Sequence, residues 1–313
     1  MARSFVFPGQ GTQAVGMGKE LAGAFPAARH LFQEVDDALE QNLSRLMFQG
    51  EEDDLTLTEN AQPALMAVSM AIIAVLRTEG GFDLAAAGKF VAGHSLGEYT
   101  ALTATRAFTL ADAARILKAR GLAMQEAVAV GEGAMAALIG VELDQAEAFA
   151  AEGAGAGVCT AANDNAPGQV VISGDAAAVE RALEIAVAGG AKRSIMLQVS
   201  APFHCALMAP AADVMADRLA AMQINRPALP VIANVTAAAE SAPEEIRRLL
   251  VEQVTSRVRW RESVLYMRDN GIDTVVEIGA GKVLTGLTRR IDRDLTGISV
   301  QTPDDIEAFA GTL

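Results

Sequence analysis

The stretch FVAGHSLGEY, residues 90–99, determines the class of fold to which this chain belongs. A short apolar run ends at Gly93, which begins the sequence G-x-S-x-G at residues 93–97, the nucleophile elbow. This pattern predicts a buried strand, a sharp turn and a helix. In this arrangement a serine sits on a strained turn and its hydroxyl projects from the sheet, while glycines two residues away on either side let helix and strand pack closely. Ser95 is therefore our candidate nucleophile. The N–H of Leu96 then opens the helix and faces the atom on which negative charge develops.

The rest of the chain alternates apolar, β-rich runs with helical patterns, which is typical of an α/β fold. We expect a strand at residues 4–7, which leads into the loop Pro8-Gly9-Gln10-Gly11. Thr109 begins a helix with a capping box, and that helix runs to about residue 128. Further helices are expected at 18–46 and 61–78, and further strands at 231–234 and 274–278.

Residues 129–199 have a different pattern of predicted strands and helices and form a candidate inserted domain. The patterns predict strands at 134–140, 157–162, 169–173 and 192–199, with helices at 144–151 and 176–188. The order β-α-β-β-α-β is that of a ferredoxin-like unit. We therefore predict a large, discontinuous α/β-hydrolase-like domain, residues 1–128 and 200–313, with a small ferredoxin-like domain, residues 129–199, inserted into it.

Composition narrows the class of partner. The chain carries 25 Lys and Arg against 39 Asp and Glu, a net charge of −14, which disfavours nucleic acid and anionic membranes as partners. Its two cysteines build neither a disulfide framework nor a zinc site, and no metal site is expected. The N-terminus does not resemble a signal peptide, and the longest apolar stretch, residues 64–76, is shorter than a bilayer requires. We expect a cytoplasmic protein.

A serine nucleophile needs a general base, and the chain offers three histidines. His30 lies in an amphipathic helical pattern and is most simply a surface residue. His94 is adjacent to Ser95, and neighbouring side chains at such a turn point apart. His204 remains, in a loop where the inserted domain returns to the large one; a packed structural histidine is the alternative interpretation. No carboxylate is marked out as a third partner, so a Ser–His dyad oriented by a backbone carbonyl fits equally well.

Arg120 falls on the apolar stripe of the helix that follows Thr109, four residues from both Ile116 and Met124. An arginine that faces a protein core is costly unless it meets an anion. An internal ion pair and a snorkelling side chain are the structural alternatives. The functional interpretation is a guanidinium fork for a substrate carboxylate, which would favour a carboxylated acyl group over acetyl by about ten- to a hundred-fold.

Together these residues resemble the malonyl-CoA:acyl-carrier-protein transacylase family, the loading enzymes of fatty acid synthesis. The similarity spans nearly the whole chain. The motifs that carry it are FPGQGTQ (7–13), GHSLGEY (93–99), ARG (119–121), NDNAPGQ (163–169), APFH (201–204) and EIGAGKVL (277–284). Two positions depart from the family: Arg257 and Ala280 stand where it often has proline. These changes affect loop stiffness and remove no reacting group.

The resemblance implies a ping-pong acyltransferase in which Ser95 takes malonyl from coenzyme A and passes it to the phosphopantetheine thiol of an acyl carrier protein. It implies that His204 acts as base and acid and that the N–H groups of Gln10 and Leu96 form the oxyanion hole. Arg120 would hold the malonyl carboxylate. Further substrate-binding residues implied are Phe203, typical of malonyl-selective members, Asn163 and Met124. The carbonyl that orients the histidine corresponds to the backbone of Arg259.

The same resemblance implies malonyl-CoA and an acyl carrier protein as partners, coenzyme A thioester as substrate, no permanently bound cofactor, and a monomer. Carrier proteins are typically acidic, and so is this chain, so docking requires a local basic patch. Three clusters are candidates, and the sequence does not rank them: Lys192 with Arg193; Arg257 with Arg261; and Arg289 with Arg290 and Arg293.

Some segments of the sequence also match motifs of other functions. GQGTQA at 9–14 matches a dinucleotide fingerprint, but the region about twenty residues on is helical, which disfavours nicotinamide binding. GAGK at 279–282 lacks the first glycine and the Ser/Thr of a P-loop. A hydrolase remains an alternative, because G-x-S-x-G also serves esterases. Two further alternatives are a related transacylase of polyketide synthesis or malonate decarboxylation, and a non-catalytic docking protein.

Overall fold

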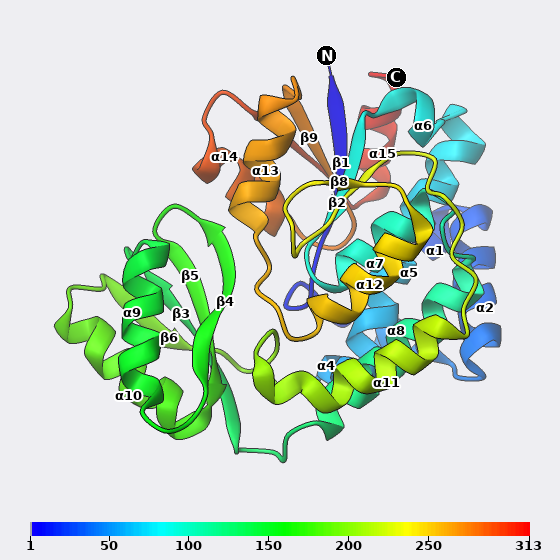
Figure 1. Ribbon diagram of the computed structural model, residues 1–313. Helices are drawn as coiled ribbons and strands as arrows, with labels where there is room; N and C mark the ends of the chain where they lie inside the picture. Colours follow the sequence, from blue (N-terminus) through cyan, green and yellow to red (C-terminus); the bar gives the residue numbers. More distant parts are fainter. Residues whose placement is uncertain (1) are drawn as a thin grey trace.

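The structure, a computed structural model, describes residues 2–313 and has the predicted α/β character. Figure 1 shows two lobes of unequal size, with the two ends of the chain close together on the larger lobe. The larger lobe contains a six-stranded sheet of order β10-β9-β1-β2-β7-β8, parallel except at β8. Its strands are β1 (Arg3–Phe7), β2 (Phe90–Gly93), β7 (Val231–Ile232), β8 (Ala239–Glu240), β9 (Thr274–Ile278) and β10 (Thr296–Val300).

Helices surround this sheet. In the N-terminal part they are α1 (Lys19–Ala24), α2 (Pro26–Leu39), α3 (Leu43–Gln49), α4 (Glu52–Thr56), α5 (Thr58–Gly80), α6 (Leu84–Ala87), α7 (Leu96–Ala104) and α8 (Leu110–Glu126). After the smaller lobe come a 3-10 turn at Ala206–Met208 and then α11 (Ala209–Ala220), α12 (Pro243–Gln253), α13 (Trp260–Asp269), α14 (Val283–Ile291) and α15 (Pro303–Ala310). The single helical region predicted at 18–46 is thus three helices, separated by the break at Phe25 and by the Asn42 cap of α3.

The smaller lobe is built by one continuous segment, β3 (Gly133–Ile139), α9 (Leu143–Ala154), β4 (Cys159–Ala166), β5 (Gln169–Asp175), α10 (Ala176–Ala188) and β6 (Arg193–Met196). Its strand order is β4-β5-β3-β6, and all neighbours are antiparallel. The order of elements is the predicted one. The last strand is shorter than the sequence suggested, because residues 197–200 leave the sheet.

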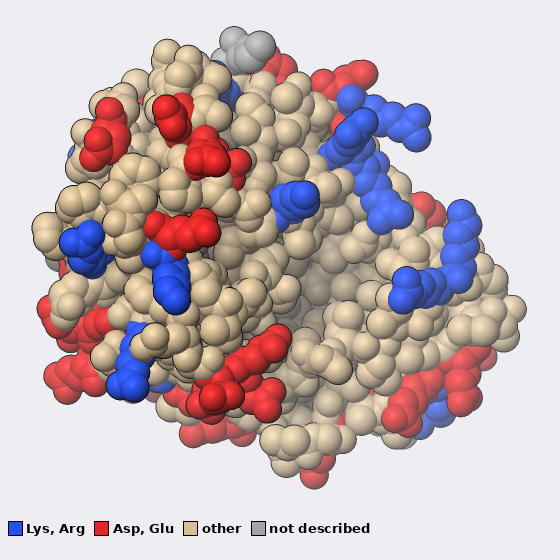
Figure 2. Space-filling view, turned by 180° about the vertical axis from the view of Figure 1, so that it is seen from behind, with Lys and Arg blue, Asp and Glu red and all other residues tan. Residues whose placement is uncertain are grey.

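A backbone seam joins the two lobes beside the elbow stretch. Asp164 N–H donates to the carbonyl of Val258, and Val258 N–H donates to the carbonyl of Ala162, so the segment before α13 extends the edge of β4. Arg261 of α13 pairs with the fully buried carboxylate of Asp164 at 2.9 Å. The seam holds the two lobes together, and Figure 2 shows a hollow on one face of the molecule.

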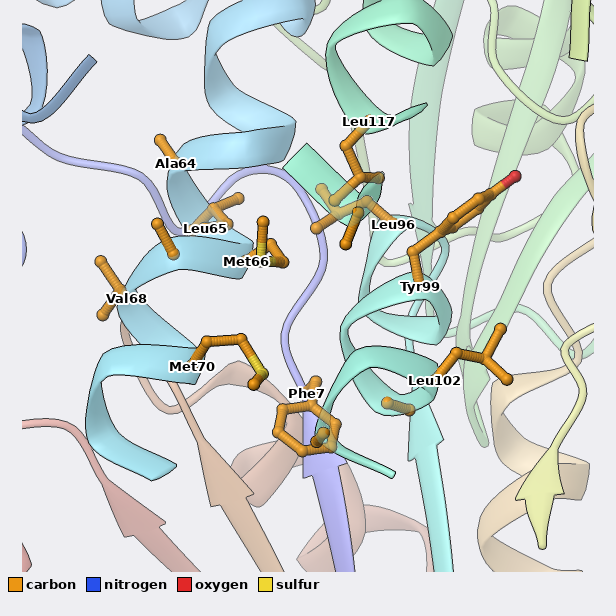
Figure 3. Close-up of a cluster of buried hydrophobic side chains, with 14 of the residues drawn as sticks. Phe7, Ala64, Leu65, Met66, Val68, Met70, Leu96, Tyr99, Leu102 and Leu117 are labelled. Atoms are coloured by element: carbon orange, nitrogen blue, oxygen red, sulfur yellow. The ribbon is translucent and has the colours of Figure 1, made fainter. Parts of the chain in front are cut away.

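Helix α5 forms the centre of the larger core. Figure 3 shows Met70 directed from α5 toward Phe7 at the end of β1, with α7, which carries Leu96 and Leu102, on the other side of Phe7. By length and composition α5 could cross a membrane, but 83% of its most apolar window is buried inside the protein. Burial on nearly all sides explains why residues 64–76 of this helix are almost entirely apolar, which is the pattern of a core helix. This packing supports the loop after β1 and the start of α7, where the candidate nucleophile lies.

Candidate active site

Ser95 occupies the sharp turn between β2 and α7, as the elbow motif predicts. Its backbone has φ 53° and ψ −110°, a conformation that costs a non-glycine residue free energy and is typical of functional sites. A Cβ on Gly93 would lie 1.9 Å from the Gly97 carbonyl group, and one on Gly97 would lie 2.3 Å from the Phe7 carbonyl oxygen. Glycine is required at both positions, because any side chain would push α7 away from the two central strands.

Asn234 and Glu98 hold the elbow from behind. The side-chain oxygen of Asn234 accepts from Ser95 N–H at 2.7 Å, and its amide nitrogen donates to the Gly93 carbonyl at 2.7 Å. The backbone N–H of Asn234 donates to Glu98 Oε2 at 3.0 Å. These bonds satisfy polar groups buried beneath the turn and oppose relaxation of its strained backbone.

The structure brings Ser95 and His204 together, with Ser95 Oγ 2.8 Å from His204 Nε2. His204 is itself at φ 60° and is 4% exposed. Burial, reinforced by the charge of Arg120, lowers the pKa of His204 to about 3. The imidazole is therefore neutral near pH 7, and its Nε2 is free to accept the serine proton once Nδ1 carries the hydrogen.

The orienting carbonyl is not that of Arg259, and this prediction is wrong. His204 Nδ1 lies 2.9 Å from the carbonyl oxygen of Gln253 and 3.1 Å from that of Ser256. Gln253 ends α12, and the last carbonyls of a helix have no partner within it. Arg259 is instead the N-cap of α13, and its carbonyl accepts from Ser263 N–H and Oγ–H. Its oxygen is thus engaged in the helix start, away from His204.

Arg120 points from α8 onto the candidate nucleophile. Only 1% of the residue is exposed, yet none of the ion pairs within residues 2–313 includes it. Its Nη2 donates to Ser95 Oγ at 3.1 Å, and its Cζ lies 5.4 Å from the centre of the Tyr99 ring. Burial lowers the pKa of this guanidinium, but from so high a starting value that we treat it as charged. An unpaired buried cation beside the nucleophile is suited to an anionic substrate.

A cavity of about 610 Å³ lies over these groups and takes its walls from both lobes. The larger lobe contributes Gln10, Ser95, Arg120 and Met124, and the smaller contributes Met135 and Asn163, with the loop 197–204 between them. Every predicted substrate-binding residue lines the cavity: Arg120, Met124, Asn163 and Phe203. Figure 2 shows the hollow, with Lys and Arg gathered along its upper right rim and Asp and Glu along its lower left rim.

The two predicted oxyanion-hole amides belong to residues on two different segments. Leu96 is the first residue of α7, and Gln10 lines the cavity in the loop after β1. Within residues 2–313 neither backbone N–H donates to another group of the chain. The Gln10 side chain is directed to the Thr58 hydroxyl at 3.2 Å, and that hydroxyl lies 2.8 Å from Ser200 Oγ. The free N–H groups are available to a carbonyl oxygen of a ligand.

The other two histidines lie where the sequence placed them. His30 is exposed on α2. His94 is half-buried at the edge of the cavity and makes no contact with Ser95 Oγ; its Nε2 lies 2.9 Å from Asn165 Oδ1 and its ring 5.6 Å from that of Trp260. Burial lowers the pKa of His94, so it is a neutral residue of the seam between the lobes.

Sequence reasoning missed four residues that organise the site: Gln62, Glu98, Asn234 and Gln253. All are at most 3% exposed, and their contacts join segments far apart in the chain. Gln253 is the most connected, because its backbone oxygen accepts from His204 while its side chain contacts Arg120, Ser95 and Glu98. A buried glutamine near a helix end carries no local sequence signal, although Glu98, inside the elbow stretch itself, could have been noticed as a carboxylate at a core position.

Comparison with known proteins gives a consistent answer. Residues 4–302 match the family model described as acyl transferase domain. The chain is 45% identical to the malonyl CoA-acyl carrier protein transacylase of Bacillus subtilis, covering 99% of this chain and 96% of that protein. The crystal structure of an acyl-carrier-protein-S-malonyltransferase from Bartonella henselae superposes with a TM-score of 0.97 at 55% identity, covering 100% and 99% of the two chains. A malonyl-transacylase in complex with its type II PKS acyl-carrier protein superposes with a TM-score of 0.96 at 41% identity, covering 100% of both chains.

Proposed function

This chain belongs to the acyl transferase domain family, among the malonyl-CoA–acyl-carrier-protein transacylases, and on that basis we propose how its residues carry out malonyl transfer. The reaction moves a malonyl group from coenzyme A to the thiol of an acyl carrier protein. We propose that it proceeds through an ester on Ser95, and that it serves fatty acid biosynthesis. The observation that carries the mechanism is that His204 Nε2 and Arg120 Nη2 both contact the Ser95 hydroxyl, at 2.8 and 3.1 Å.

In the first half-reaction His204 Nε2 accepts the proton of Ser95 as Oγ attacks the thioester carbonyl of malonyl-CoA. The carbonyl oxygen becomes an oxyanion, which the free N–H groups of Gln10 and Leu96 stabilise. When the tetrahedral intermediate collapses, the C–S bond breaks, and the imidazolium returns its proton to the coenzyme A sulfur. The carbonyls of Gln253 and Ser256 hold His204 in the required tautomer throughout.

The second half-reaction repeats these steps in reverse order with a different thiol. His204 takes the proton of the phosphopantetheine thiol, whose sulfur attacks the malonyl ester, and the bond between the acyl carbon and Ser95 Oγ breaks. His204 then returns the proton to Ser95. Arg120 keeps the malonyl carboxylate in one place during both halves, and Phe203, Met124 and Asn163 form the walls around the acyl group.

The three basic clusters differ in how far their charge is available to an acidic carrier protein. Arg257 pairs with Glu147, and Arg261 pairs with both Glu142 and Asp164, so this cluster is neutralised within the chain. The other two clusters are exposed and take part in none of the ion pairs of the described residues: Lys192 and Arg193, and Arg289, Arg290 and Arg293.

These two clusters form one surface. Arg290 Nη1 donates to Gln169 Oε1 at 2.7 Å, and Gln169 is paired with Ile139, which is paired in turn with Arg193. We name the five residues Lys192, Arg193, Arg289, Arg290 and Arg293 the basic rim. In Figure 2 Lys and Arg gather beside the hollow on the side of α14. We propose that the basic rim docks the carrier protein and directs its phosphopantetheine arm into the cavity.

The finer description of the chain belongs to the same proposal. We assign residues 1–128 and 200–313 to an α/β-hydrolase-like catalytic domain and residues 129–199 to a ferredoxin-like domain, and the strand order of the smaller sheet supports the second assignment. We further propose a monomeric cytoplasmic enzyme that needs no bound cofactor and does not act on nucleic acid or membranes.

The test is a mass measurement on the intact protein. With malonyl-CoA alone, the wild type should gain one malonyl group and keep it until carrier protein is added, whereas Ser95→Ala should gain none. Rapid loss of the ester to water would favour a hydrolase. An adduct that forms equally well on Ser95→Ala would refute the role of this serine.

A further inference from the structure

Within residues 2–313, the guanidinium of Arg120 is held by two neutral amides and by no carboxylate. Its Nη1 donates to Gln62 Oε1 and its Nη2 to Gln253 Oε1, both at 2.9 Å. Gln62 is 2% exposed and Gln253 is fully buried. The two glutamines come from α5 and from the end of α12, so the guanidinium is held between separate elements of the larger lobe.

The surroundings of each glutamine fix which end of its amide faces Arg120. The amide nitrogen of Gln253 donates to Glu98 Oε2 at 2.8 Å and to the Ser95 carbonyl at 3.1 Å, and both of these atoms accept hydrogen bonds. Its oxygen must therefore face the guanidinium. The amide nitrogen of Gln62 faces the sulfur of Met124 at 3.7 Å, also an acceptor, which directs the Gln62 oxygen to Arg120 in the same way.

The choice of amides has an electrostatic consequence. A buried guanidinium is usually paired with a carboxylate, which satisfies its N–H groups and also cancels its charge. An amide oxygen satisfies an N–H group in the same geometry but leaves the positive charge uncompensated. Arg120 is thus fixed in place beside the Ser95 hydroxyl while its charge stays available to a ligand.

We propose that Gln62 and Gln253 are positioning residues that set the selectivity of the enzyme for carboxylated acyl groups, by holding Arg120 without neutralising it. The inference rests on the proposed function, because it assumes that Arg120 binds the carboxylate of the acyl group. It assigns the choice between malonyl and acetyl to the residues behind the arginine as well as to the arginine itself.

The experiment exchanges the Gln62 amide for a carboxylate of the same shape. Gln62→Glu places a negative charge at the position that now lies 2.9 Å from Arg120 Nη1, so an internal ion pair competes with the substrate carboxylate. We expect the malonyl-to-acetyl ratio of kcat/KM for acyl transfer to fall about 100-fold, mainly through a higher KM for malonyl-CoA. Gln62→Met removes the hydrogen bond without adding charge, and we expect that ratio to fall only about tenfold.

Two controls make the result specific. Gln223→Glu adds the same charge at an exposed position outside the cavity and should leave the ratio unchanged. Thermal unfolding of each variant shows whether it is folded; if Gln62→Glu is not, Gln62→Met alone tests the proposal, and an unchanged ratio in that variant overturns it.

A folded Gln62→Glu variant with the wild-type ratio would overturn the inference. Equal losses of malonyl and acetyl transfer in Gln62→Glu and Gln62→Met would do the same, because they would show a merely structural role. Failure of the proposed function looks different: in that case the wild type itself would acquire no malonyl group on Ser95.

Discussion

At the scale of single residues, the site depends on two buried groups whose charge states matter for function. His204 is kept neutral, and Arg120 is kept charged but unpaired. Burial keeps His204 neutral, whereas Arg120 keeps its charge despite burial because the pKa of a guanidinium starts so high. The functional expectations at this scale concern substrate selectivity and pH.

Arg120→Ala should reduce malonyl transfer more than acetyl transfer. The substitution removes charge-assisted hydrogen bonds to the malonyl carboxylate, each worth about 1.5–3 kcal/mol, so kcat/KM for malonyl-CoA should fall by at least about ten- to a hundred-fold. Acetyl-CoA has no carboxylate and should be affected much less. Steady-state kinetics with both thioesters provide the measurement, and equal losses would assign Arg120 a structural role.

The rate of acyl loading should not show the acid limb of an ordinary histidine. A histidine with the usual pKa of about 6.5 loses its capacity as a base tenfold for each pH unit below that value. The pKa of His204 is about 3 and remains below the assay range, so kcat/KM for malonyl-CoA should stay flat with respect to this group from pH 8 to pH 5.

Glu98 titrates within that same range, because burial raises its pKa to about 7 despite the nearby charge of Arg120. An inflection near pH 7 that disappears in Glu98→Gln would therefore belong to the carboxyl behind the elbow. An inflection near pH 6.5 that persists in Glu98→Gln would contradict the assignment of His204 as a neutral, buried base.

At the scale of elements, the elbow between β2 and α7 determines where Ser95 lies, and a substitution at Gly97 tests whether close packing at this turn is needed. In Gly97→Ala the new Cβ would lie 2.3 Å from the Phe7 oxygen and 2.8 Å from the Pro8 oxygen, both in backbone that has little room to move. We expect a loss of about 1–3 kcal/mol in stability and a larger loss of acyl transfer, because α7 and Ser95 must shift. Thermal unfolding and the mass-shift assay measure the two effects.

Gly23→Ala is the matched control. Gly23 is exposed in α1, and a Cβ there would meet no atom within 4 Å. Alanine is the better helix former by about 0.5–1 kcal/mol, so this variant should be as stable as the wild type or more so, with unchanged activity. If Gly97→Ala behaved like Gly23→Ala, the close packing of α7 on the central strands would not be needed for function.

The elements also show what the sequence could and could not predict. The elbow, α8 and the alternation of strands and helices in 133–196 were predictable, because each has a local signature in periodicity, capping or turn residues. Strand β10 was missed, since its residues Thr296–Val300 are mostly half-exposed and lack a strong apolar run. The orienting carbonyl was placed at Arg259 instead of Gln253 and Ser256, because the position of a helix end depends on tertiary packing.

The same distinction holds for the candidate site. Ser95, His204 and Arg120 could be found from a motif, from elimination and from a charge on an apolar stripe. Gln253 and Asn234 could not, because each acts through contacts with residues more than 130 positions away in the chain, and neither has a local mark. Such buried polar networks arise from the fold as a whole.

At the scale of the whole molecule, an acidic enzyme must attract an acidic partner, and the basic rim is where the distribution of charge permits this. Its five residues come from β6, the turn before it, and the end of α14 with the turn after it, so the surface exists only when the two lobes are held together. The seam of Asp164, Val258 and Arg261 supplies that connection. If the carrier protein docks at the rim as proposed, docking and catalysis are linked through the relative position of the lobes.

Charge reversal at the rim should weaken docking without affecting the chemistry on Ser95. In the double variant Lys192→Glu and Arg290→Glu we expect the KM for carrier protein to rise about tenfold or more at low salt, and the difference to shrink as added salt screens the interaction. Formation of the malonyl ester from malonyl-CoA should keep the wild-type rate, since it does not involve the carrier protein. The double variant Arg218→Glu and Arg226→Glu, an equal charge change at exposed residues in the last turn of α11 and in the loop after it, is the control. Arg257 and Arg261 are already paired with carboxylates, so their replacement tests the alternative. If the KM for carrier protein changed when these two residues were replaced, but not when the rim residues were replaced, the docking surface would lie at the seam.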